Sequence, residues 1–122
     1  MMDAIGKRGE DEACRWLIAK GHTVLERNWR GGHCEIDIIT LDSTGLHFVE
    51  VKSRKAPVAA DPLVNVTAAK QKHLVQAALK FLHGGDRRFE DEEVNFDIIT
   101  VVFYGDDARI EYYPQAIIPI YD

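Results

Sequence analysis

The residues best suited to chemistry lie in the stretch 35–54, where charged side chains interrupt two apolar, β-branched runs. Asp37 belongs to the first run, and Glu50 and Lys52 belong to the second, separated by a single valine. Runs of this composition are typical of strands, and the Asp-Ser-Thr-Gly stretch between them is typical of a turn. The stretch is therefore predicted to form a hairpin whose strands both carry charged residues.

The register of this hairpin decides which charged side chains meet. If the two leucines that flank the turn pair with each other, Asp37 lies opposite Glu50, and Glu35 lies opposite Lys52, with Cβ atoms about 5 Å apart. A one-residue bulge at Gly45 would instead shift the pairing by one residue and make the two acidic side chains diagonal neighbours. In either register, two carboxylates and an ammonium group are expected to form one patch.

Two carboxylates at this spacing repel each other by roughly 3 kcal/mol at an effective dielectric constant near 20. A divalent cation bound between Asp37 and Glu50 would replace this repulsion with ligation, and carboxylate oxygens suit Mg²⁺ or Mn²⁺. The adjacent Lys52 could then position a water molecule and stabilise charge on a phosphate, as phosphodiester hydrolysis requires. The alternative is that both carboxylates form ion pairs, with Lys52 and with a helix residue, and perform no chemistry.

A further carboxylate is predicted to face the same region. The pattern of residues 3–20 indicates a helix, and Glu10 falls on its apolar stripe with Ala13 and Leu17. An acidic side chain on the buried face of a helix could supply another metal ligand. The alternative is that it forms an ion pair with Lys52, Lys70 or Arg27.

The rest of the chain must provide the elements that position these residues. Helix, three strands, helix and strand in this order predict an α/β fold in one domain, 1–122, with a mixed sheet covered on both faces. The apolar tail 116–121 is expected to pack on this sheet or to contact a second subunit in a homodimer. The remaining patterns predict a strand over 23–28, a turn over 29–32, a loop over 55–65, a helix over 67–83, a strand over 94–104 and a short strand ending at Tyr113.

The charge of the chain is unevenly distributed. The net charge of −5 argues against strong nonspecific binding of DNA, but residues 52–88 contain eight Lys and Arg against two Asp. This basic zone could contact phosphates beside the carboxylates, or it could be a solvated helix face. No apolar run is long enough for a membrane span, and two cysteines without Cys-x-x-Cys spacing fit a reducing cytoplasm.

Several short segments carry a family resemblance: Gly-Lys-Arg-Gly-Glu at 6–10, Arg-Asn-Trp-Arg at 27–30, Glu-Ile-Asp-Ile-Ile at 35–39, Phe-Val-Glu-Val-Lys-Ser-Arg at 48–54, Lys70, and Phe-Asp at 96–97. Together they resemble the YraN-like family of predicted endonucleases, small bacterial relatives of archaeal Holliday-junction resolvases. Its Asp and Glu-x-Lys pattern is the PD-(D/E)xK signature of nucleases. The resemblance implies a restriction-endonuclease-like three-layer core and hydrolysis of DNA.

We therefore predict a Mg²⁺- or Mn²⁺-dependent deoxyribonuclease that acts on branched or single-stranded DNA. Asp37, Glu50 and Glu10 would hold the ion, Lys52 would act on water and phosphate, and Glu35 would support Lys52. The rival hypothesis is a nucleic-acid-binding or assembly module that keeps the nuclease fold without turnover. Side chains expected to contact DNA are Arg30, Arg54, Lys70 and Gln71.

Overall fold

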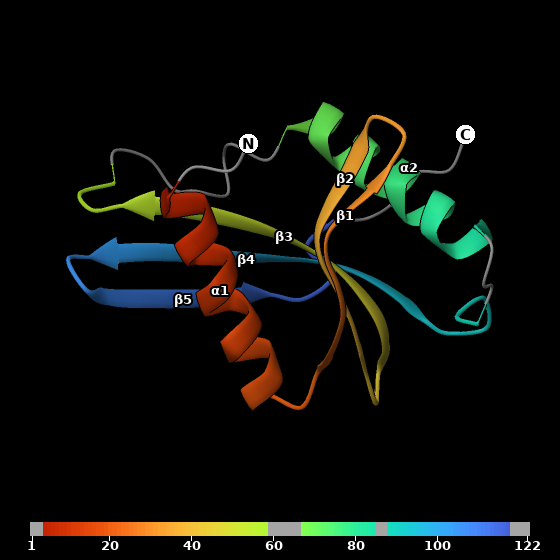
Figure 1. The fold of residues 1–122 in the computed structure, drawn as a ribbon, viewed down its shortest axis with the longest axis horizontal. Coiled ribbons are helices and arrows are strands. Elements are labelled where there is room, and N and C mark those ends of the chain that lie inside the picture. The colour runs from red at the N-terminus through yellow and green to blue at the C-terminus, as the bar shows by residue number, and fades with distance from the viewer. Residues whose placement is uncertain (1–3, 59–66, 85–87, 118–122) are drawn as a thin grey trace.

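The computed structural model describes residues 4–58, 67–84 and 88–117, which form two helices and one five-stranded sheet (Figure 1). The predicted α/β class is confirmed, and the short final strand joins the same sheet. The helices are α1 (Ala4–Ala19) and α2 (Ala68–His83), and the strands are β1 (Thr23–Gly31), β2 (Cys34–Asp42), β3 (Gly45–Lys55), β4 (Val94–Tyr104) and β5 (Asp107–Tyr113).

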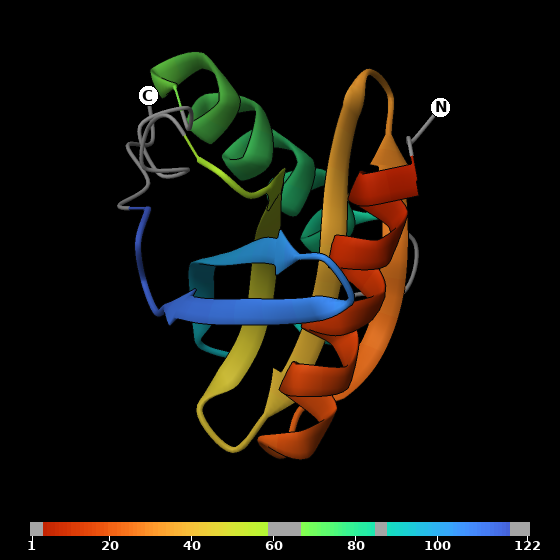
Figure 2. The same ribbon diagram turned by 90° about the vertical axis from the view of Figure 1, so that its left-hand side faces the viewer.

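The sheet is mixed, with strands in the order β1-β2-β3-β4-β5. All neighbouring strands are antiparallel except β3 and β4, which are parallel. A parallel pair needs a crossover connection, and α2 lies in the chain between these two strands. Helix α1 covers one face of the sheet and α2 covers the other (Figure 2), so the predicted three layers are present.

The core consists of two apolar clusters, one on each face of the sheet. Phe48 and Phe96 stack at 5.6 Å between ring centroids on the α2 side, where Leu74 packs with them. Val49, the next residue after Phe48, belongs to the cluster on the α1 side together with Leu17. Burial of each such side chain stabilises the fold by roughly 1.5–3 kcal/mol. The period-two alternation of β3 thus fixes which of its residues face each helix.

The first strand is longer than predicted. The expected turn over 29–32 is wrong at its first three residues, because Trp29, Arg30 and Gly31 belong to β1 and pair with β2. Trp29 has a packing reason to remain in the strand, since its ring contacts Phe81 of α2 edge to face at 5.4 Å. The turn begins only at Gly32, whose φ of +63° is a conformation that glycine adopts without strain.

The helix predicted over 67–83 is confirmed, with Thr67 as its N-cap: the Thr67 side chain accepts a hydrogen bond from the Lys70 N–H at 3.2 Å. The predicted loop over 55–65 is wrong at Lys55, which ends β3. The part 59–65 of this loop and most of the apolar tail lie outside the described residues. Ile117, at the start of that tail, is 3% exposed and packs in the cluster on the α2 side. No described helix is both long enough and apolar enough to cross a membrane.

Candidate functional site

The hairpin of β2 and β3 has the first of the two predicted registers. Leu41 pairs with Leu46, and Gly45 pairs directly with Asp42, so the bulge considered at Gly45 does not occur. The pairing of β2 with β3 extends from the turn only as far as Ile38 and Val49. Asp37 and Glu50 are therefore the first residues beyond the end of this ladder.

The two strands diverge beyond Ile38. From there β2 stays paired with β1, and β3 stays paired with β4 (Figure 1). The Asp37 side chain occupies the point of divergence, where its Oδ2 accepts a hydrogen bond from the Val51 backbone N–H at 2.8 Å. A carboxylate thus satisfies a strand donor that the neighbouring strand would otherwise satisfy, and the sheet opens beside it.

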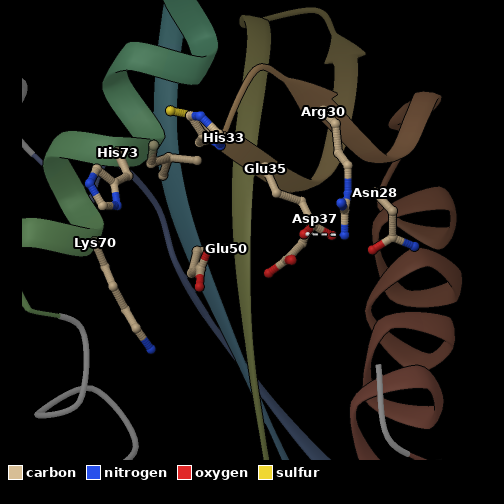
Figure 3. A pocket seen from close by; sticks show the side chains of 10 residues that line it. Asn28, Arg30, His33, Glu35, Asp37, Glu50, Lys70 and His73 are labelled. Atoms are coloured by element: carbon tan, nitrogen blue, oxygen red, sulfur yellow. Dashed lines mark ion pairs between the residues drawn. The ribbon is translucent and has the colours of Figure 1, made fainter. Parts of the chain in front are cut away.

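A pocket of about 560 Å³ lies in this opening. One wall comes from β1 and the β1–β2 turn, and the opposite wall comes from α2, with Asp37 and Glu50 between them (Figure 3). The lining residues are Asn28, Arg30, His33, Cys34, Glu35, Asp37, Glu50, Lys70, His73 and Leu74. The volume falls in the range of pockets that bind small ligands or parts of larger ones.

Asp37 and Glu50 cannot readily both be ionised in this position. Burial, with the Glu50 charge as the next contribution, raises the pKa of Asp37 to about 8. Burial also raises the pKa of Glu50, although the ammonium groups of Lys52 and Lys70 oppose the change. Two neighbouring carboxyl groups with raised pKa values share a proton or bind a cation. The predicted acidic pair is therefore present and is electrostatically strained.

Glu10 fits both interpretations offered for it. Its side chain is 2% exposed, and Oε1 accepts hydrogen bonds from Arg27 Nε at 2.9 Å and Asn28 Nδ2 at 3.0 Å. Oε2 is buried and has no hydrogen-bond partner in the described structure. Glu10 also lines a second pocket, of about 240 Å³, together with Asp37 and Lys52. One oxygen is thus structural, and the other is left available to a ligand.

Two backbone features place Glu10 here. At Gly9, α1 approaches β3 so closely that an added Cβ would lie 1.7 Å from Ser53 Oγ, so the contact excludes a side chain. On β1, Asn28 has a φ of 51°, a left-handed conformation that asparagine tolerates better than most residues. That conformation accompanies the hydrogen bond from its amide to Glu10.

The environment of Lys52 makes its ammonium group lose a proton more readily than that of an ordinary lysine. The side chain is 7% exposed. Burial and the adjacent Lys70 ammonium lower the pKa of Lys52 to about 8, while Glu50 acts in the opposite direction. A lysine with a pKa near neutrality can hold a phosphate when protonated and can accept a proton when neutral.

The predicted role of Glu35 is not supported. Because the ladder ends at Ile38 and Val49, Glu35 does not pair with Lys52 across the hairpin, and that prediction is wrong. Glu35 instead forms an ion pair with Arg30, with 3.6 Å between Oε2 and Nη2 (Figure 3). The splaying of β2 away from β3 separates the two residues that an unbroken hairpin would bring together.

The four residues predicted to contact DNA lie in different places. Arg30 and Lys70 line the larger pocket, and Arg54 lines the smaller one, where it also donates a hydrogen bond to the Ser53 carbonyl at 2.8 Å. Gln71 is half-buried on α2 and lines neither of these two pockets. Three of the four thus lie beside the carboxylates.

The donor atoms suit a hard divalent ion. Asp37, Glu50 and the free Oε2 of Glu10 offer only carboxylate oxygens, which Mg²⁺ and Mn²⁺ accept. In the described structure, the carboxylates of these three residues are too far apart for all three to offer oxygens that lie within 4.8 Å of one another. Mg²⁺ commonly uses one or two carboxylates and completes its coordination with water, so the Asp37–Glu50 pair is sufficient.

Sequence reasoning missed several residues that line the pocket, namely Asn28, His33, Cys34 and His73. His73 had a readable signal, because it lies three residues after Lys70 on the same side of a helix. Asn28 and His33 had no such signal in the sequence. The position of Asn28 depends on its own left-handed backbone conformation, and that of His33 depends on where β1 ends.

Comparison with known proteins identifies the family. The sequence model of "Uncharacterised protein family UPF0102" matches residues 9–101, which include the acidic pair and Lys52. A UPF0102 protein of Prosthecochloris aestuarii is 39% identical over 101 residues, which cover 83% of this chain and 78% of the relative. One of Myxococcus xanthus is 37% identical over 111 residues, covering 91% and 86%. One of Oleidesulfovibrio alaskensis is 42% identical over 98 residues, covering 80% of this chain and 48% of the relative. The YraN-like resemblance is confirmed, and the chain belongs to the uncharacterised family UPF0102.

Proposed function

We propose that this protein is a metal-dependent deoxyribonuclease. The observation that carries the proposal is the pair Asp37 and Glu50, two half-buried carboxyl groups with raised pKa values at the open end of a hairpin. The ammonium groups of Lys52 and Lys70 lie beside the pair. Carboxylates that bind a cation, next to ammonium groups that attract phosphate, are the combination that phosphodiester hydrolysis needs.

Each residue is assigned a role in this proposal. Asp37 and Glu50 hold Mg²⁺ or Mn²⁺, and the free Oε2 of Glu10 completes the set directly or through water. The ion, when bound, lowers the pKa of a bound water molecule and neutralises phosphate charge. Arg27 and Asn28 fix the Glu10 carboxylate through its other oxygen, which keeps Oε2 directed away from them.

Lys52 acts on the reacting groups rather than on the ion. Its ammonium group orients the attacking water and stabilises the charge that develops on the phosphate oxygens. With a pKa of about 8, a fraction of Lys52 is neutral, and in that form the amine can take up the proton that the water loses and become the ammonium group. Lys70 and Arg30, on opposite walls of the pocket, hold the phosphates on either side of the cleaved bond.

Branched or single-stranded DNA is the proposed substrate. The chain carries a net charge of −5, and its basic residues are concentrated in 52–88 rather than spread over a surface that could follow a duplex. A pocket between β1 and α2 admits a strand that can bend into it more easily than a stiff duplex. The two cysteines are free, in keeping with a reducing compartment such as the cytoplasm.

The test is cleavage of duplex, single-stranded, flap and four-way-junction DNA by the purified protein in Mg²⁺ or Mn²⁺. Cleavage should disappear in chelator and in Asp37→Asn and Glu50→Gln, while the exposed Asp107→Asn serves as a matched control and should cleave normally. Cleavage that persists in both site variants would refute the assignment. DNA binding without cleavage of any substrate, in either metal, would support the rival hypothesis of a silent binding module.

A further inference from the structure

A second cluster of ionisable side chains lies at the other end of the β2–β3 hairpin, near its turn and the end of α1 (Figure 2). His22 follows α1, Asp42 ends β2, and His47 lies near the start of β3. Both histidines are buried, and the Asp42 side chain is 16% exposed. The proposed nuclease chemistry uses none of these residues.

Each of the three side chains offers one potential ligand atom, and these atoms lie close together. His22 Nε2 lies 3.3 Å from Asp42 Oδ2, and His47 Nε2 lies 2.8 Å from Asp42 Oδ1. In the described chain, this is the one group of three such residues whose ligand atoms all lie within 4.8 Å of one another. A tetrahedral zinc ion with bonds of about 2.0–2.1 Å places its ligand atoms about 3.3 Å apart. Small movements of the two rings would therefore admit an ion.

The outer nitrogens of both rings are already fixed. His47 Nδ1 lies 2.6 Å from Asp97 Oδ2, and His22 Nδ1 lies 2.7 Å from Thr40 Oγ1. Asp97 is held in turn by the hydroxyl of Tyr112 at 2.6 Å. Histidines that bind metals usually donate their second ring N–H to a carboxylate or another oxygen, which orients the ring and sets its tautomer. Both histidines have such a partner, and in both the remaining nitrogen faces Asp42.

A fourth position is available on the solvent side. Thr44 Oγ1 lies 2.7 Å from Asp42 Oδ1 and 3.0 Å from His47 Nε2, and Thr44 is exposed in the turn. The hydroxyl can remain as a ligand or give way to water. The partly exposed Asp42 provides the entry path that an otherwise buried site needs.

We propose that His22, His47 and Asp42 bind one Zn²⁺ ion. Two imidazoles and one carboxylate suit zinc, whereas Mg²⁺ prefers oxygen ligands. The ion would join the end of α1 to the turn of the central hairpin, with Asp97 of β4 as the outer partner of one ligand. Its position at the opposite end of the hairpin makes it independent of the acidic pair in the pocket.

The direct experiment is titration of the chelator-treated full-length protein with Zn²⁺, followed by calorimetry and by metal analysis after dialysis. We expect one Zn²⁺ per chain, retained in excess Mg²⁺, and a melting temperature raised by several degrees. Asp42→Asn keeps the shape of the side chain and should weaken Zn²⁺ binding at least tenfold, as should His47→Gln. His83→Asn removes an exposed histidine near Glu90 and is the matched control that should bind normally.

Two further measurements separate this site from its alternatives. In NMR spectra of the wild-type protein, the ring resonances of His22 and His47 should shift when Zn²⁺ is added. This measurement does not depend on the folding of any variant. Asp37→Asn should bind Zn²⁺ as tightly as the wild type. Zn²⁺ binding that is unchanged in Asp42→Asn, or shifts confined to His33 and His73, would place the ion in the pocket and overturn the proposal. Absence of tight binding would also overturn it.

Discussion

Replacing Asp37 with Asn should stabilise the protein in chelator, and the gain should grow with pH. In the folded protein, burial and Glu50 raise the pKa of Asp37 from 3.8 to about 8. A raised pKa means that folding takes up a proton, so the contribution of Asp37 to stability is full below about pH 4 and is lost as the pH rises through 8. Asn does not titrate, and its side-chain oxygen can still accept the Val51 N–H. The variant therefore avoids this loss.

The size of the effect follows from the same shift. A change of about four pKa units corresponds to at most about 5–6 kcal/mol, at roughly 1.4 kcal/mol per unit. Separation of the diverging strand ends admits water and relieves part of this cost, so we expect a gain of about 2 kcal/mol at pH 9 and almost none at pH 4.5. For a chain of this size, 2 kcal/mol raises the melting temperature by roughly 8 °C.

The assay is thermal and urea denaturation at pH 4.5, 7 and 9 in chelator, repeated with excess Mg²⁺. Mg²⁺ should stabilise the wild type and leave Asp37→Asn nearly unchanged, because the ion stabilises only the state that binds it. Asp107→Asn, at an exposed position at the start of β5, controls for the loss of one negative charge. If Asp37→Asn is less stable than the wild type at pH 9, or if the two proteins have parallel pH profiles, then Asp37 is a structural ion-pair partner and the reasoning fails.

Three further predictions concern the same site. Lys52→Ala should reduce the cleavage rate at least a hundredfold, while the affinity for Mg²⁺ changes less than threefold. The control variant Lys55→Ala, at an exposed position, should change neither. If Lys52→Ala loses metal affinity and still cleaves, the assigned roles are reversed. Gly9→Ala should lower the free energy of unfolding, measured in urea, by about 1–3 kcal/mol, because its Cβ would overlap the Ser53 side chain. If the single variant Gly9→Ala, with Ser53 unchanged, is as stable as the wild type, the close contact is contradicted. Cleavage rates should be higher on a four-way junction or a single strand than on linear duplex, and equal rates would exclude the substrate preference.

The convergence of the acidic pair was predictable from sequence because it depends on local rules. Alternation along two strands and the pairing of Leu41 with Leu46 place Asp37 and Glu50 at corresponding positions. The position of Glu10 followed from the helical stripe that it shares with Leu17. These inferences needed only periodicity and one turn, and the structure confirms the elements on which they rest.

The divergence of β2 from β3 could not be predicted in this way. At the point of divergence, the Asp37 side chain accepts a hydrogen bond from the Val51 backbone N–H. Glu35 consequently forms an ion pair with Arg30 and not with its predicted partner, Lys52. The cluster of His22, Asp42 and His47 was missed for another reason. Its members lie in the α1–β1 connection and in two strands, and periodicity assigns a residue to a face without identifying its buried polar neighbours. Only the assembled sheet shows that two ring nitrogens face one carboxylate.

The parallel pairing of β3 with β4 has a consequence for how the chain folds. The other strand pairs are hairpins with short turns, but this pair is separated by α2 and joins residues 48 positions apart, as in Leu46 with Val94. Contacts between distant residues are slow to form because the intervening chain must lose entropy before the pairing is rewarded. The hairpin that carries Asp37 and Glu50 can close first, while α2 and β4 are still unattached. In this order of assembly, α2 would bring Lys70 to the acidic residues only after the hairpin that carries them has closed.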